Sequence, residues 1–90
     1  MPRLHLKYLC HIMVATGKME EHFESKKDTL LDLIMELDEK YPGLKEIFIP
    51  PESGLFNAGT AITLSRPGEP ARGISDPSFR LKEGDVLILW

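Results

Sequence analysis

The chain has 90 residues, of which 42% are hydrophobic and 28% charged, and its formal net charge is −3. These values are typical of a small globular domain and exclude a disordered chain. No apolar run approaches the roughly 18 residues of a membrane-spanning helix, and the first seven residues contain no signal-peptide pattern. We therefore expect one domain over residues 1–90 and a cytoplasmic location.

Charge and cysteine content narrow the class of partner. Residues 1–27 have a balance of +2 and residues 28–46 a balance of −4, with no clustered basic stripe. This pattern argues against a nucleic-acid partner. Cys10 is the single cysteine, so it cannot form an internal disulfide or hold an iron–sulfur cluster, and it fits a reducing compartment.

Two strands are predicted at the start of the chain. Residues 3–10 alternate, which predicts a half-buried strand with one side formed by Leu4, Leu6, Tyr8 and Cys10. After a turn at residues 15–18, residues 19–24 alternate again and predict an antiparallel second strand. The apolar connection over residues 11–16 either extends these strands or lies across the end of the sheet.

The best-defined element is a helix that begins near Thr29, with Asp28 as a rival N-cap. Pro42 and Gly43 end it, and Leu44 is expected to fold back on it. An apolar stripe at helical spacing predicts the buried side, formed by Leu30, Leu33, Ile34, Leu37 and Tyr41.

The second half of the chain is less regular. Residues 47–49 form a brief apolar run, residues 54–59 a loop, and residues 60–65 a strand with Ile62 and Leu64 inward. Residues 66–78 contain three prolines and predict a structured loop or open hairpin. Glu83-Gly84-Asp85 supplies a turn before a last buried strand, Val86 to Leu89.

This order of elements favours an α+β fold. One helix has to cover one face of a mixed four- to five-stranded sheet, and a last strand parallel to the first would close it. That arrangement is the β-grasp, or ubiquitin-like, fold.

Three segments resemble the MoaD/ThiS sulfur carriers: Thr29-Leu30-Leu31-Asp32-Leu33-Ile34, Tyr41-Pro42-Gly43-Leu44 and Leu81-Lys82-Glu83-Gly84-Asp85-Val86. The resemblance covers nearly the whole chain. It implies a non-enzymatic carrier, linked to sulfur transfer or molybdopterin-type cofactor assembly, that contacts an activating-enzyme-like protein or a larger synthase or oxidoreductase subunit.

The family's chemistry resides in a flexible tail ending Gly-Gly, whereas this sequence ends at Trp90. No catalytic or cofactor-binding residue is therefore carried over, and no cofactor is expected. The alternative is an interaction module, or a small subunit of a metalloenzyme, that has lost the tail. A third possibility is that the natural chain continues to a Gly-Gly tail.

Other candidate sites have simpler interpretations. His5, His11 and His22 lack the further ligands of a metal site and are expected on the surface. Cys10 shares the phase of Leu4 and Leu6, which favours a buried, inert thiol. Four acidic residues of the helix region are expected to form a solvated face: Asp28, Asp32, Glu36 and Glu39.

An apolar patch is expected on the sheet face away from the helix. Either Val86 and Ile88 or Leu87 and Leu89 must point there. We expect a partner-binding face formed by Leu9, Leu87, Leu89 and Trp90. In the alternative interpretation this face is covered by Phe48, Leu55 or Phe56.

Overall fold

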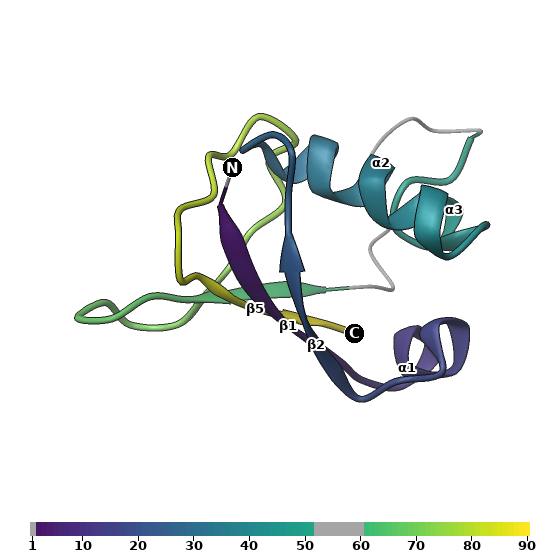
Figure 1. Cartoon of the computed structure of the whole chain (residues 1–90), viewed down its shortest axis with the longest axis horizontal. Coiled ribbons are helices and arrows are strands. Elements are labelled where there is room, and N and C mark those ends of the chain that lie inside the picture. The colour runs from purple at the N-terminus through teal and green to yellow at the C-terminus, as the bar shows by residue number, and fades with distance from the viewer. Residues whose placement is uncertain (1, 52–60) are drawn as a thin grey trace.

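The computed structural model describes residues 2–51 and 61–90, which form one sheet with helices on one side of it (Figure 1). The strands are β1 (Arg3–Tyr8), β2 (Glu20–Glu24), β3 (Ile62–Ser65), β4 (Arg72–Gly73) and β5 (Val86–Leu89). The helices are α1 (His11–Thr16), α2 (Leu30–Lys40) and α3 (Leu44–Phe48). The predicted mixed sheet with one main helix is confirmed.

In the described part of the chain the sheet has five strands, in the order β2-β1-β5-β3-β4. β1 pairs antiparallel with β2 and parallel with β5, and β5 pairs antiparallel with β3. His5 therefore lies between His22 on one side and Val86 on the other. The first and last strands of the chain occupy the centre of the sheet, as the β-grasp prediction requires.

Helix α2 has the predicted N-cap and buried stripe. The hydroxyl of Thr29 accepts a hydrogen bond from the backbone N–H of Asp32 at 3.2 Å, which satisfies one of the donors left open at a helix start. Asp28, the rival cap, instead pairs with Arg80 at 2.8 Å. Four residues of the apolar stripe are fully buried: Leu30, Leu33, Ile34 and Leu37. The fifth, Tyr41, is partly buried and packs at the edge of the core.

The connection over residues 11–16 is a helix, α1, so the alternative in which it extends the strands is wrong. Its position beyond the end of β1 and β2 agrees with the other alternative, that it lies across the end of the sheet (Figure 1). Ile12 and Thr16 are buried and lie four residues apart, so one side of a short helix covers the end of the core. Gly17, at a φ of 73°, ends the helix with its N–H bonded to the carbonyl of Met13.

Residues 44–48 form a second unpredicted helix, α3. Gly43 turns the chain at a φ of 96°, and the Asp38 carboxylate accepts hydrogen bonds from the N–H groups of Gly43 and Lys45 at 3.1 and 3.0 Å. Leu44 and Phe48 point into the core, so the apolar spacing here is helical, with a period of four.

The rest of the second half follows the prediction where it is described. Ile62 and Leu64 are buried, and β4 pairs with β3, so residues 66–78 contain an open hairpin. The loop expected at residues 54–59 lies outside the described residues. Within the described ranges, no helix has both the length and the apolar character that a bilayer-spanning segment requires.

Candidate functional site: the open face of the sheet

The candidate site is the open face of the sheet, which is the side opposite α2. On β5 the side chains of Val86 and Ile88 point to this face and are half-buried, whereas Leu87 and Leu89 are fully buried. Leu87 lies between Leu6 and Leu64, both core residues. The prediction that Leu87 and Leu89 belong to a partner-binding face is therefore wrong, because their strand phase turns them toward α2.

Leu9 and Trp90, the other two predicted residues, extend the open face past the end of β5. The N–H of Leu9 donates to the carbonyl of Leu89 at 3.0 Å, which continues the parallel pairing and places Leu9 beside Trp90. Trp90 exchanges backbone hydrogen bonds of 2.9 and 2.7 Å with Ala61. The side chains of Leu9 and Trp90 are 42% and 48% exposed. We call Leu9, Val86, Ile88 and Trp90 the apolar strip.

The apolar strip lies between polar rows. Thr63 and Ser65 of β3 flank it on one side, and the Trp90 Nε1–H donates to the Thr63 hydroxyl at 3.4 Å. Of the residues expected to cover the strip in the alternative interpretation, Phe48 is the last residue of α3 and is fully buried in the core, so it does not cover this face. The other two, Leu55 and Phe56, lie outside the described residues.

On the other side of the apolar strip, β1 and β2 carry charged and histidine pairs. Arg3 lies opposite Glu24, and Lys7 opposite Glu20. Between these pairs, the His5 and His22 rings stack with centroids 4.6 Å apart, and His5 Nε2 lies 2.7 Å from Glu20 Oε1.

The histidines do not assemble a metal site in the described part of the chain. His11 is exposed on α1 and His22 is exposed on β2, whereas the His5 side chain is partly buried, so only the first two match the surface prediction fully. No three His, Cys, Asp or Glu side chains among the described residues are grouped as metal ligands.

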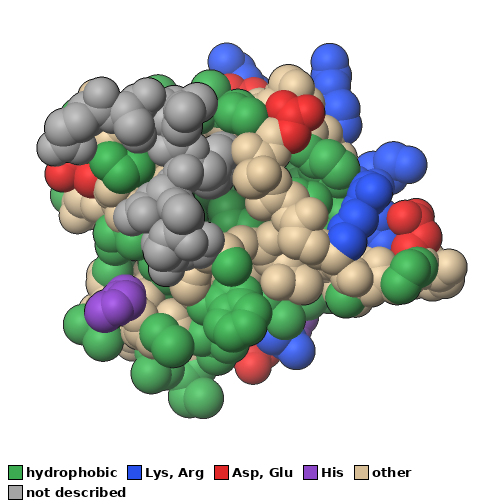
Figure 2. All heavy atoms as spheres, turned by 180° about the vertical axis from the view of Figure 1, so that it is seen from behind, with side chains coloured by type: hydrophobic (Ala, Val, Ile, Leu, Met, Phe, Trp, Pro, Cys, Tyr) green, Lys and Arg blue, Asp and Glu red, His purple; other side chains and the backbone are tan. Residues whose placement is uncertain are grey.

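Helix α1 adds exposed apolar side chains that the sequence reasoning missed. Met13 is 37% and Val14 80% exposed. Figure 2 shows apolar side chains gathered in the lower part of the molecule, over α1 and the end of β5. The available signal was the four-residue spacing of Ile12 and Thr16, which turns the residues between them outward.

Cys10 is exposed, so the prediction of a buried thiol is wrong. β1 ends at Tyr8, and Cys10 adopts a φ of 53° in the turn before α1. The alternation that placed Cys10 with Leu4 and Leu6 therefore stops before it reaches the residue.

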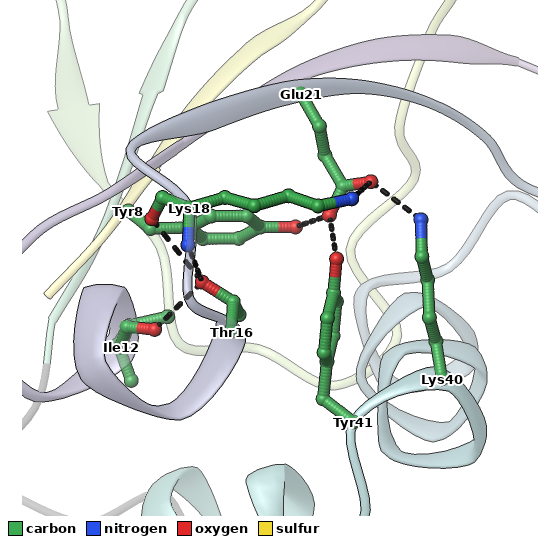
Figure 3. Close-up of polar contacts among 7 residues, drawn as sticks. All are labelled: Tyr8, Ile12, Thr16, Lys18, Glu21, Lys40 and Tyr41. Carbon is green, nitrogen blue, oxygen red and sulfur yellow. Dashed lines mark hydrogen bonds and ion pairs between the residues drawn. The ribbon is translucent and has the colours of Figure 1, made fainter.

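A cluster around Glu21, shown in Figure 3, ties β2 to α2 on the covered side of the sheet. The Glu21 carboxylate accepts hydrogen bonds of 2.6 Å from the hydroxyls of Tyr8 and Tyr41 and from Lys40 Nζ. Lys18 Nζ lies 3.5 Å away. The Glu21 side chain is 9% exposed, so its charge is nearly enclosed by donors.

These contacts shift two pKa values in opposite directions. Burial would raise the pKa of Glu21, but hydrogen bonds from Lys40, Tyr41 and Tyr8 outweigh it and lower the pKa to about 2. Burial, together with the hydrogen bond to the Glu21 carboxylate, raises the pKa of the Tyr8 phenol. Glu21 is thus an ionised residue that links β2 to α2. The only sign of this in the sequence is that Glu21 lies two residues before Phe23, on the same side of the strand.

The acidic face of the α2 region is only partly solvated. Glu36 is half-buried and accepts hydrogen bonds from the Ser25 hydroxyl at 2.7 Å and the Lys26 N–H at 2.8 Å, so the prediction of a solvated Glu36 is wrong. Asp32 belongs to the helix cap and Asp28 to the Arg80 ion pair. Glu39 is exposed, as predicted.

Comparison with known proteins identifies the fold. No protein-family model and no characterised protein sequence matches the chain. Among solved structures, small archaeal modifier protein 1 of Methanosarcina acetivorans matches with a TM-score of 0.74 at 18% identity, over 99% of this chain and 91% of that one. The same modifier from Haloferax volcanii matches with a TM-score of 0.68 at 20% identity, over 98% and 92%.

A third similar structure comes from Pyrococcus furiosus and is provisionally assigned as molybdopterin converting factor, subunit 1. It matches with a TM-score of 0.70 at 22% identity, over 99% of this chain and 95% of that one. At these identities the likeness establishes the fold. The chain therefore has the ubiquitin-like β-grasp fold of the small archaeal modifiers and of molybdopterin converting factor subunit 1, which confirms the predicted fold class.

Proposed function

We propose that this chain is a carrier-type β-grasp protein, active in sulfur transfer or molybdopterin-type cofactor assembly, that docks its open face on a protein partner. Two features support this. The fold is that of a converting-factor subunit and of modifier proteins, and the motifs over residues 29–34, 41–44 and 81–86 resemble those of sulfur carriers.

The apolar strip is the observation that carries the docking part of the proposal. Leu9, Val86, Ile88 and Trp90 leave apolar surface on the side of the sheet that α2 does not cover. A partly exposed tryptophan beside aliphatic side chains, framed by polar residues, is the composition of an interface centre with its rim.

The charged pairs of β1 and β2 would orient the partner. Arg3 and Lys7 border the apolar strip, while Glu20 and Glu24 lie one strand farther out. A partner of matching shape would need acidic groups close to the apolar contact and basic groups beyond it. An activating-enzyme-like protein, or a larger synthase or oxidoreductase subunit, is the proposed class.

Titration against an activating enzyme with ATP tests the docking. We expect Ile88→Asp to weaken binding by about tenfold or more, because it places a charge in the centre of the interface. The matched control is Met35→Asp, since Met35 is 46% exposed on α2, and this variant should bind as the unmodified chain does. If the aspartate disturbs the strand, Ile88→Thr replaces it as the test variant, because threonine keeps a β-branched side chain. Equal binding by both Ile88 variants and the control would contradict the docking.

Intact mass separates the carrier from the alternative. A carrier incubated with an activating enzyme, ATP and a sulfur donor should gain mass at its C-terminal carboxylate. The alternative function, a non-carrier interaction module or small metalloenzyme subunit, predicts a stable complex whose formation is weakened by Ile88→Asp while the mass of the chain stays unchanged.

A further inference from the structure

The free edge of the sheet at β2 offers unpaired backbone groups. β2 is the outermost strand next to β1. The N–H of Ser25 donates to Pro2 and the N–H of Tyr8 to Met19, at 2.9 and 2.8 Å. In an antiparallel pair these bonds alternate, so the outward N–H and C=O groups belong to Glu20, His22 and Glu24. No residue in the described ranges forms a hydrogen bond with them.

A hollow of about 400 Å³ lies beside this edge, between β2 and α2. Phe23 is half-buried in it, and Lys40 Nζ lies 5.8 Å from the centre of the Phe23 ring. The hollow is also lined by Glu36 and Glu39 of α2 and by Lys26, so its charges are mixed. An extended chain paired with β2 would point alternate side chains into this hollow, where an apolar group could cover the Phe23 ring.

The charges along the β2 edge indicate which kind of chain could pair with it. Glu24 and Glu39 are exposed and form no ion pair with described residues, and Glu20 is 60% exposed with one carboxylate oxygen 2.7 Å from His5 Nε2. A second copy is disfavoured, because antiparallel pairing of two β2 strands centred on His22 would place Glu20 of one copy opposite Glu24 of the other, and like charges directly opposite destabilise a sheet. A basic segment would meet opposite charges instead.

We propose that the β2 edge binds an extended, basic segment of a partner protein as a sixth strand of the sheet. Backbone hydrogen bonds form with Glu20, His22 and Glu24. Basic side chains on the open-face side lie against Glu20 and Glu24, and apolar side chains on the α2 side cover Phe23. Strand addition of this kind takes affinity from the main chain and specificity from alternate side chains.

The test uses a capped seven-residue peptide of alternating lysine and valine, titrated into the folded chain and followed by amide hydrogen exchange. At saturation we expect the amides of Glu20, His22 and Glu24 to exchange at least about tenfold more slowly. A peptide with glutamate in place of lysine should not bind. A lysine–valine peptide with a central proline should bind more weakly because it lacks a donor. Absence of binding, or binding without amide protection, would refute strand addition.

Variants of the edge separate backbone pairing from simple charge attraction. His22→Pro removes an outward N–H at a position where an edge strand tolerates proline, and should abolish peptide protection of the edge. His22→Thr loses the same ring but keeps the N–H, and should bind normally. Glu24→Gln should weaken binding about two- to fivefold, whereas Glu46→Gln on α3 should not.

Equal binding of the peptide by His22→Pro and His22→Thr, with both folded by circular dichroism, would overturn the backbone pairing. If His22→Pro fails to fold, backbone pairing is tested on the unmodified chain by comparing the lysine–valine peptide with its central-proline version. Equal amide protection by the two peptides would overturn the backbone pairing.

Discussion

Replacing Glu21 by glutamine should remove a pH-dependent part of the stability. The Glu21 carboxylate accepts hydrogen bonds from Tyr8, Tyr41 and Lys40 at 2.6 Å each. Glu21→Gln keeps the shape of the side chain and removes its charge. The Tyr8 and Lys40 donors would then face a neutral amide in a nearly enclosed site.

The size of the effect follows from the pKa of Glu21, which is lowered from 4.5 to about 2 in the folded chain. Each pKa unit corresponds to about 1.4 kcal/mol, so ionised Glu21 stabilises the fold by about 3 kcal/mol. Because the folded pKa is the lower one, this stabilisation is present above pH 4.5 and is lost as the pH falls toward 2. A chain of this size is stable by about 5 to 13 kcal/mol, so the variant should still fold.

Denaturant unfolding followed by circular dichroism, between neutral pH and about pH 2, measures the difference between the two proteins. We expect Glu21→Gln to be less stable by about 3 kcal/mol at neutral pH and nearly equal to the unmodified chain at about pH 2. Glu24→Gln, on the same strand but exposed, should change stability by less than about 0.5 kcal/mol throughout. A Glu21→Gln deficit that is constant with pH would refute the reasoning.

Two further outcomes are expected. Asp85 is 1% exposed and binds the Arg66 guanidinium at 2.9 and 3.1 Å, so Asp85→Ala should lower the free energy of unfolding by about 3 to 5 kcal/mol. The control variant Arg80→Ala breaks only the exposed pair with Asp28 and should lower the free energy of unfolding by less than about 1 kcal/mol. Similar losses for both variants would contradict the burial argument. Cys10 is exposed and should react with a thiol reagent in the native protein about as fast as in denaturant, whereas protection until unfolding would contradict its position in the turn.

The sequence allowed the main helix and most of the sheet to be predicted because each has a strong period. Alternation marks β1 and β2, and the stripe from Leu30 to Tyr41 marks α2. α1 and α3 have six and five residues. Such short helices span too few turns for a period to be distinguished from other patterns, and their shape is fixed by the core that they cover.

Leu9 and Trp90 lie on the open face of the sheet as predicted, but the side of β5 that faces the same way was not predicted correctly. Val86 to Leu89 is apolar throughout, so no polar residue marks which side of β5 faces the core. Pairing with Leu6 and Leu64 decides it, and buries Leu87 instead of Ile88. This information lies in distant strands, and periodicity along β5 could not supply it.

The parallel pairing of β1 with β5 has a consequence for synthesis on the ribosome. His5 to Tyr8 pair with Val86 to Leu89, so the centre of the sheet joins the earliest and latest translated strands described here. A nascent chain can form α2 from local contacts, but β1 has no neighbour on its inner edge until β5 has left the exit tunnel. Folding of this sheet is therefore completed only after nearly all of it has been translated, and the unpaired inner edge of β1 stays available to chaperones until then.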